Sequence, residues 1–437
     1  MPNATYEICV DWDNNGNFTG TYDDITADVK SIQFSRGKDD ELGKAQTGNL
    51  TITVKNATSK YSPENSGGVL YGKLLPKRPI RVRAIYAAQT YNLFYGYIEE
   101  IIPHPHWQEQ DCIITAMDGL DFLSRHDLDT ALYKSQLTGM IHGYILDSAG
   151  WPAGMRTLDA GQDTIPYWYS SGIKARFAQN DLDDSELGFS YVDGAGYFRF
   201  EDRHHRFTST HQTSQATFSD TMVNLPYNYN PRHVYNEVSV TVTPWALQAI
   251  TELWRLEEIP SIPAGETLTW WGQASVSGSD VFVDAWTTPV ITTDYTANSQ
   301  SDGGGTNMTA DLSIVTTKFA RTIKLDITNN GSVPAYLTLL KARGTYYDDE
   351  TKVTRKASDS TSQTAYQKRT LNVDGKYMTS AVLAQDYGLF AISRYKNPQA
   401  EVSMEIVNSS AALLTQILSR EISDRITVVN TELGLNK

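Results

Sequence analysis

The first 116 residues contain a closely spaced series of short segments in which apolar and polar residues alternate. The segments are residues 5–11, 29–34, 50–54, 80–86 (IRVRAIY), 91–102 and 112–116. Alternation places every second side chain on the same face of a strand, so each segment can bury one face and expose the other. Short strands at this spacing predict a small antiparallel barrel or sandwich.

The pattern changes after residue 116. Residues 117–123 and 137–149 place apolar residues at three- and four-residue steps, which predicts short helices packed on a sheet. Residues 185–202 predict two strands around the turn sequence 193–196 (DGAG), and residues 233–244 predict a further strand. We therefore expect a mixed α+β middle region over residues 116–254.

The following segment, residues 255–345, is rich in Thr, Ser, Gly and Asp and contains strand-like runs. It predicts an inserted β-sandwich with its own core. Residues 347–365 are charged and rich in Ser and Thr, which predicts a linker. Beyond it we expect a helix over residues 379–395, then strands over 400–407 and 425–429. A chain of 437 residues is too long for one core, so the sequence predicts a multi-domain, mainly β fold with some α.

The charge balance limits how the chain can handle nucleic acid. It has 37 Lys and Arg against 51 Asp and Glu, a net charge of −14. This excess argues against a broad basic face that holds phosphate, although an acidic wall could let DNA pass without sticking. Cys9 and Cys112 are too few for a disulfide scaffold or a four-cysteine zinc site. With no signal-peptide pattern and no apolar run of bilayer length, we expect no secretory signal and no membrane-spanning segment.

The sequence lacks the short motifs of nucleophilic and phosphate-binding enzymes, such as GxSxG, HExxH and GxxxxGK. We therefore expect neither catalysis nor a cofactor. A glycosidase built on two carboxylates stays open, because their separation depends on the fold.

Two segments have some features of metal sites. Residues 11–16 (DWDNNG) begin like a calcium loop, but its twelfth position is Tyr22 instead of a bidentate Glu. His104 and His106 could face one side of a strand, but they alternate with prolines, which favours an edge or a loop. We therefore expect no metal site.

Three tryptophans lie in the predicted insert. Trp270, Trp271 and Trp286 could form an exposed platform on which a sugar stacks. The alternative is that they fill the core of the sandwich, which needs a few buried aromatic side chains. Both interpretations stay open at the level of the sequence.

Four stretches occur in a fixed order along the chain. The first is residues 10–18 (VDWDNNGNF) with 23–37 (DDITADVKSIQFSRG), and the second is residues 47–66 (TGNLTITVKNATSKYSPENS) with 74–84 (LLPKRPIRVRA). The third is residues 93–105 (LFYGYIEEIIPHP) with 112–125 (CIITAMDGLDFLSR). The fourth is residues 362–366 (SQTAY), the predicted helix with Ala384 and Ala391, and residues 419–426 (SREISDRI).

In this order the stretches resemble the hub-forming minor tail proteins of long-tailed bacteriophages. These are related to the baseplate hub of contractile phages and to the hub portion of type VI secretion spikes. The family's Tyr-Gly pair is Tyr366 and Gln367 here. The resemblance covers about residues 1–240 and 346–430 and leaves the predicted insert unassigned.

The resemblance implies a structural role in the virion, at the distal end of a tail. It implies two tube-like β-barrel domains, over residues 1–115 and 346–437, separated by the middle region and the insert. Three chains would form a homotrimer that closes a sixfold tail tube with threefold symmetry. Its implied partners are the distal tail or tube protein, the tape-measure protein and a tip or fibre protein, with DNA passing through the lumen. The insert allows an alternative, a tail-tip protein that contacts a carbohydrate receptor.

Overall fold

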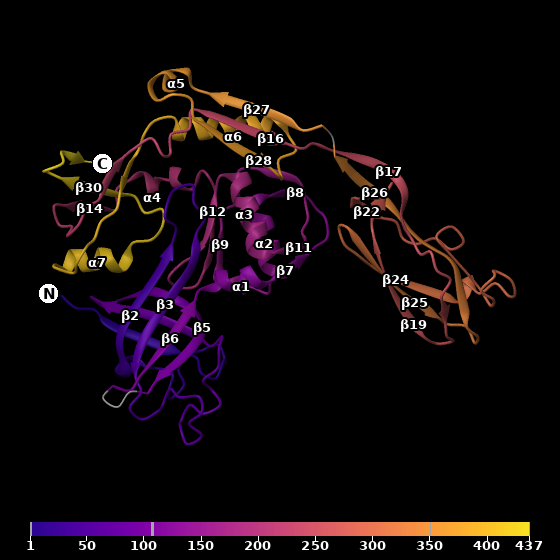
Figure 1. Ribbon diagram of the computed structural model, residues 1–437, viewed down its shortest axis with the longest axis horizontal. Coiled ribbons are helices and arrows are strands. Elements are labelled where there is room, and N and C mark those ends of the chain that lie inside the picture. Colours follow the sequence, from indigo (N-terminus) through magenta and orange to yellow (C-terminus); the bar gives the residue numbers. More distant parts are fainter. Residues whose placement is uncertain (1, 106–108, 350, 437) are drawn as a thin grey trace.

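The computed structural model describes residues 2–105, 109–349 and 351–436. It has 43% of its residues in strands and 18% in helices, which confirms the expected mainly β class. A curled sheet at the N-terminus lies below a mixed region and a small sheet with a helix, and an arm of strands extends to one side (Figure 1).

The N-terminal strands form one antiparallel sheet that curls into a half-barrel. Its order is β1-β4-β5-β6-β3-β2. The alternating apolar residues of the sequence form the buried face of this sheet. In β3, for example, Leu50, Ile52 and Val54 are all buried. Ala87 and Ala88, both at positive φ, form the two-residue turn that joins β4 to β5. The elements are β1 (Thr5–Val10), η1 (Thr26–Asp28), β2 (Val29–Gly37), β3 (Gln46–Lys55), β4 (Pro79–Tyr86), β5 (Gln89–His104) and β6 (Asp111–Met117).

The middle region packs three helices and a hairpin around a single core. Asp118 begins α1 by accepting a hydrogen bond from Leu120 N (2.9 Å), and it also accepts one from Gly48 N of β3 (2.8 Å). The two expected helices and the 193–196 hairpin are present, whereas α3 was not expected. The elements are α1 (Gly119–Arg125), β7 (Asp127–Asp129), β8 (Tyr133–Leu137), α2 (Thr138–Ser148), η2 (Ala153–Met155), β9 (Arg156–Leu158), β10 (Thr164–Trp168), β11 (Ser171–Lys174), α3 (Ala175–Glu186), β12 (Phe189–Val192), β13 (Phe198–Glu201), η3 (His205–Phe207) and α4 (Ser209–Gln212).

The C-terminal part pairs with strands from earlier in the chain. β16 lies between β27 and β28, and α6 packs on this sheet. Ser380 begins α6 by accepting from Val382 N, and Ser410 begins α7 by accepting from Leu413 N. The elements are β14 (Ala216–Ser219), β15 (Tyr227–Tyr229), β16 (Glu237–Val242), β27 (Val353–Ser358), α5 (Ser360–Tyr366), β28 (Thr370–Gly375), α6 (Ala381–Tyr395), β29 (Ala400–Val402), α7 (Ala411–Ser419), β30 (Ile426–Asn430) and β31 (Leu435–Asn436).

Two expectations for this part need correction. The predicted linker over residues 347–365 is wrong, because residues 353–358 form β27 and α5 begins at Ser360. The strand expected over 400–407 is regular only from Ala400 to Val402. The domain limits at residues 115, 254 and 345 stay a prediction.

The predicted insert lies within residues 245–349, which enclose one core between two sheets. β17 and β26 run side by side as its entry and exit, and β19, β25 and β24 form the facing sheet. Tyr169 stacks on Phe282, at 5.0 Å between ring centroids, and Lys134 forms an ion pair with Asp284, so the insert also contacts the middle region. The elements are β17 (Trp245–Arg255), β18 (Ser261–Ile262), β19 (Thr267–Gln273), β20 (Ser275–Val276), β21 (Ser279–Asp280), β22 (Phe282–Trp286), β23 (Tyr295–Asn298), η4 (Thr309–Asp311), β24 (Leu312–Lys318), β25 (Thr322–Asn329) and β26 (Ala335–Asp349).

The separate core of the insert gives a stability prediction. Leu325 is fully buried there, so Leu325→Ala should destabilise the insert by about 2–5 kcal/mol through lost burial and an unfilled cavity. Hydrogen exchange should quicken in β24 and β25 while β3 of the half-barrel keeps its protection. Val315→Ala, at a residue 65% exposed in the facing sheet, is the control and should stay within about 0.5 kcal/mol of wild type. Equal loss of protection in β3 would contradict an independent core.

Candidate functional site

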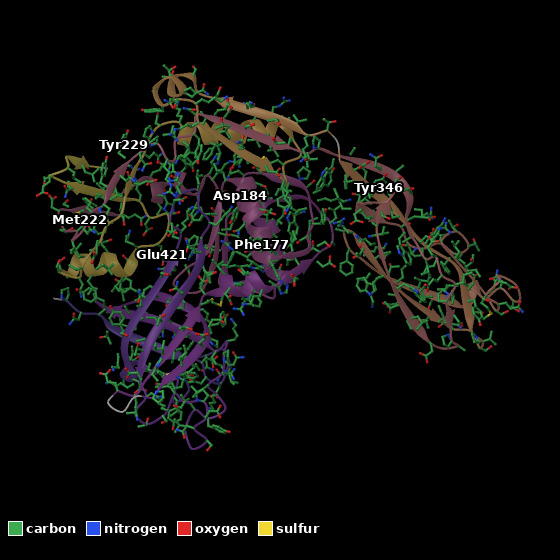
Figure 2. All side chains as sticks on the ribbon, in the orientation of Figure 1. Phe177, Asp184, Met222, Tyr229, Tyr346 and Glu421 are labelled. Carbon is green, nitrogen blue, oxygen red and sulfur yellow. The ribbon has the colours of Figure 1, made fainter. Side chains whose placement is uncertain are left out.

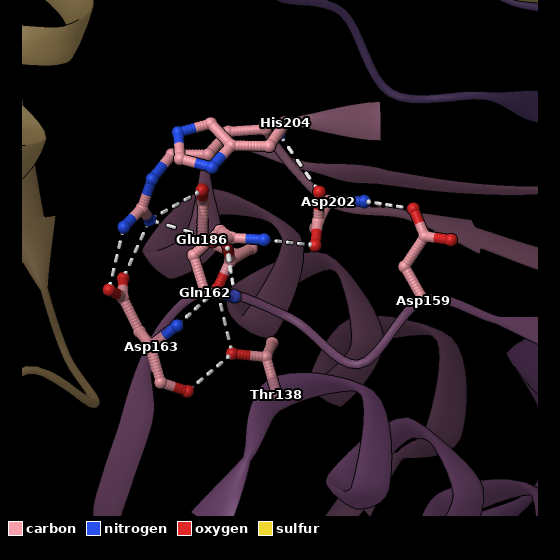
Figure 3. Close-up of polar contacts among 8 residues, drawn as sticks. Thr138, Asp159, Gln162, Asp163, Glu186, Asp202 and His204 are labelled. Atoms are coloured by element: carbon pink, nitrogen blue, oxygen red, sulfur yellow. Dashed lines mark hydrogen bonds and ion pairs between the residues drawn. The ribbon is translucent and has the colours of Figure 1, made fainter. Parts of the chain in front are cut away.

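A buried cluster of charges lies in the middle region, close to where its core meets the C-terminal sheet (Figure 3). Arg203, just after β13, donates from both terminal nitrogens to the two carboxylate oxygens of Asp163, each at 2.8 Å. One of those nitrogens also lies 3.3 Å from Glu186 Oε1 at the end of α3. Asp163 is 5% exposed and Glu186 is 0% exposed, so one guanidinium serves two buried carboxyl groups.

Backbone and hydroxyl donors complete the cluster. Glu186 accepts from Gln162 N (3.0 Å), from Asp163 N (3.2 Å) and from the Thr138 hydroxyl (2.9 Å). Burial raises the pKa of Glu186 to about 7; the Arg203 charge opposes this rise, and the Asp163 charge adds to it. The cluster therefore fixes the loop before β10 against the end of α3 and holds a carboxyl group that titrates near neutrality.

This raised pKa predicts a pH-dependent stability. The folded chain keeps the proton of Glu186 up to about pH 7, whereas the unfolded chain loses it near pH 4.5. Stability should therefore fall as the pH rises through this window, by up to about 3 kcal/mol. Chemical denaturation at several pH values should show this fall in wild type and a flatter profile in Glu186→Gln. Glu64→Gln, at an exposed residue, should keep the wild-type profile.

A second buried pair joins α2 to α3. His142 Nε2 lies 3.3 Å from Asp183 Oδ1, and both residues are essentially unexposed. The other Asp183 oxygen accepts from the Ser190 hydroxyl at 2.8 Å, and Arg176 donates to that hydroxyl at 2.7 Å. Burial acts to raise the pKa of Asp183, but His142 and Arg176 lower it overall, so this carboxylate is held charged.

A pocket of about 430 Å³ opens beside these groups, where the half-barrel loop, α3, β28 and α6 meet. Several of its ionic groups bind one another. Arg394 donates to Glu41 at 3.0 Å, and Lys376 lies 2.5 Å from Asp181. The buried carboxyl groups of Asp163 and Glu186 are held by Arg203, which leaves neither open to a sugar ring. The expected absence of catalysis stays a prediction.

The sequence did not reveal this cluster. Arg203, His204, His205 and Arg206 form a basic run that favours a solvated turn, and His204 is indeed exposed. The side chain of Arg203, however, is only 9% exposed, because the chain turns it inward toward Asp163. Only the three-dimensional placement of α3 supplies the two carboxyl partners.

The three tryptophans of the insert do not form one platform. Trp286 is 6% exposed and donates from Nε1 to the Phe319 carbonyl at 2.8 Å, so its ring belongs to the core. Trp270 packs against the same core, whereas its neighbour Trp271 is 57% exposed. Trp271 stacks beside Phe319 with ring centroids 5.9 Å apart. Only Trp271 therefore presents a ring to solvent.

The segments examined for metal binding have ordinary structural roles where they are described. The Asp11 carboxylate is buried and accepts from Asn15 N (3.1 Å) and Gly16 N (2.8 Å), as in a tight turn. His104 is exposed at the end of β5, and His106 lies outside the described residues. In the described part of the chain, no three His, Cys, Asp or Glu side chains gather as metal ligands would. No described helix is both long and apolar enough to span a membrane.

No protein-family model and no curated protein matches the sequence. Among solved structures, the 43 kDa tail protein of prophage MuSo2 from Shewanella oneidensis matches with a TM-score of 0.49 and 11% identity, over 100% of this chain and 91% of that one. A prophage tail protein from Listeria monocytogenes matches with a TM-score of 0.43 and 7% identity, over 99% and 87%.

A third match is an E. coli component of the type VI secretion system, described as similar to tail proteins of bacteriophage T4. Its TM-score is 0.27 at 9% identity, over 78% of this chain and 73% of that one. The names of these neighbours are those of phage tail proteins and of a type VI secretion component.

Proposed function

We propose that this chain is a structural tail-hub protein that closes the end of a phage-type tail tube. The observation that carries the proposal is the convergence of the sequence stretches that resemble this family. Residues 10–18, 23–37, 47–66, 74–84, 93–105 and 112–125 supply the half-barrel and its first adjoining helix. Residues 419–426 return to the same body, where Glu421 binds Arg36 of β2.

In the proposed assembly, three chains form a ring at the distal end of the tail. Three chains with two similar β-barrel domains each would form a closed ring. Such a ring can match a sixfold tube on one side and a threefold tip on the other. The distal tail or tube protein, the tape-measure protein and a tip or fibre protein are the proposed neighbours. The net charge of −14 fits a bore through which DNA slides, because each added cation would hold phosphate.

Light scattering after size exclusion and negative-stain imaging test the oligomer. The expected particle is a threefold ring, alone or within assembled tails. A chain that stays monomeric both at high concentration and inside assembled tails would exclude the hub. A ring with a neutral or basic bore would remove the proposed role of the acidic charge while leaving the structural role intact.

The exposed ring of Trp271 favours a second candidate function, contact with a carbohydrate receptor through the insert. Stacking on an aromatic face is how proteins commonly hold the CH groups of a sugar. Trp271→Ala should reduce adsorption to host cells and leave folding unchanged. Val315→Ala removes an equally exposed apolar side chain from the same sheet and is the matched control. Equal adsorption by both variants and wild type would exclude this function.

A further inference from the structure

The segment between α7 and β30, residues 420–425, contacts several distant parts of the chain, and we call it the clasp. Figure 2 shows Glu421 between α7 and the strands of the half-barrel and middle region. On one side, α7 inserts Leu414 and Leu418 into the half-barrel core. On the other side, β30 pairs in parallel with β14. The clasp therefore bridges two anchored elements.

The clasp binds the half-barrel through a bidentate ion pair. Arg36 donates to both carboxylate oxygens of Glu421, at 2.5 and 2.6 Å, and its Nε donates to the Leu93 carbonyl at 3.0 Å. The Arg36 side chain is 17% exposed, so solvent screens this pair less than a surface pair. Ile422, the next residue, packs against the core of the middle region.

Ser423 is the point at which the clasp meets the middle region. Its hydroxyl bonds to Glu201 of β13 and accepts from Arg206 Nε at 3.1 Å, and its carbonyl lies 2.7 Å from His211 Nδ1. The φ of Ser423 is 70°, in the left-handed region that residues other than glycine rarely adopt. A conformation of this kind persists only while surrounding contacts hold it. The clasp is therefore strained and depends on its polar partners.

Two of the residues that bind Ser423, Glu201 and His211, lie beside the titratable side chain of His205. His205 Nδ1 lies 2.7 Å from Asp159 Oδ2, and its Nε2 lies 3.6 Å from Glu201 Oε1. Its ring centroid is 4.8 Å from that of His211. The hydrogen bond to Asp159 raises the pKa of His205 against the opposing effect of burial, and nearby carboxylates add to the rise. The titratable and charged groups around the His205 site and the clasp include Arg36, Glu41, Asp159, Tyr191, Arg199, Glu201, Asp202, Arg206, His211, Arg420, Glu421, Asp424 and Arg425.

We propose that the clasp is a proton-sensitive lock between the C-terminal part and the rest of the chain. With His205 protonated, its charge balances Asp159 and Glu201, and Glu201 stays in place to hold Ser423. With His205 neutral, the carboxylates of Asp159 and Glu201, each beside one of its ring nitrogens, lose that cation, and the strained Ser423 loses its support. The lock is therefore closed at lower pH and loosens as the pH rises through the folded-state pKa of His205.

Hydrogen exchange of the full chain tests this lock, with rates corrected for the intrinsic effect of pH. Peptides that cover residues 419–426 should exchange severalfold faster at about pH 8 than at about pH 6, on either side of the ordinary histidine pKa of about 6.5. Peptides from β3 should show no such difference. In His205→Gln, residues 419–426 should exchange fast at both pH values.

The control is His233→Gln. His233 also binds a carboxylate, Glu401 at 2.7 Å, but that carboxylate belongs to the separate β15–β29 sheet. This variant should keep the pH difference in residues 419–426. If His205→Gln does not fold, Asp159→Asn removes the same ion pair and should reduce the difference. A wild-type clasp with no pH difference, a difference that survives the loss of the His205–Asp159 pair, or an equal change in β3 would overturn the proposal.

Discussion

Arg203→Met is expected to lower the free energy of unfolding by about 3–5 kcal/mol, as for other buried ion pairs that lose one partner. Arg203 is the only cation that the described contacts give to the buried carboxyl groups of Asp163 and Glu186. Methionine keeps much of the side-chain volume but removes the charge, so the Asp163 carboxylate stays buried without compensation and Glu186 loses the cation that opposes its protonation. Denaturant unfolding at neutral pH measures the change.

Neutral partners should restore much of this loss. Adding Asp163→Asn and Glu186→Gln to Arg203→Met removes the uncompensated charge, so the triple variant should be more stable than the single one. Arg232→Met is the matched control, because Arg232 is 67% exposed and lies 4.0 Å from Asp40. It should change stability by no more than about 0.5 kcal/mol. A single variant as stable as this control would show that the cluster is not held by Arg203.

Phe200→Ala should cost about 3–5 kcal/mol, the usual range for a buried phenylalanine. Phe200 of β13 is 1% exposed, and its ring lies against the His142 imidazole with centroids 4.1 Å apart. Its loss would leave a cavity beside the buried pair of His142 and Asp183, where water could enter. Thermal and denaturant unfolding both measure the change.

Phe207→Ala is the control for that substitution. Phe207 is 52% exposed, close to β13 in the chain, and its loss creates no comparable cavity. It should stay within about 0.5 kcal/mol of wild type. Similar effects at the two positions would mean that the core around Phe200 can collapse to fill the space.

The sequence predicts those parts of the fold whose pattern is local. Alternation locates the half-barrel strands, and the 3.6-residue period locates α6, which runs over Ala381–Tyr395 against an expected 379–395. It misses α3, because residues 175–186 bury polar and acidic side chains such as Gln179, Asp183 and Glu186. The apolar stripe of α3 is limited to Ala175, Ala178 and Leu182, and the buried polar residues beside it obscure the helical pattern. The long-range pairing of β16 with β28 also leaves no local sign.

The candidate sites, too, can be predicted from the sequence only where they depend on neighbouring residues. Trp270 and Trp271 are adjacent, so their side chains must point to opposite faces of β19, and only the structure shows which face is covered. The clasp is part of the motif at residues 419–426, but its partners Arg36 and Glu201 lie hundreds of residues earlier in the chain. Spacing along the chain cannot indicate such contacts.

The insert leaves and re-enters the rest of the chain between two paired strands. β16 and β27 pair antiparallel, and Val242 and Val353 are direct partners at the point where the chain leaves for the insert and returns. Cutting at this pair and closing the gap with a two-residue turn would leave an ordinary β-hairpin. The segment between Val242 and Val353 therefore occupies the place of a hairpin turn, and a change in its length need not alter the β16–β27 register.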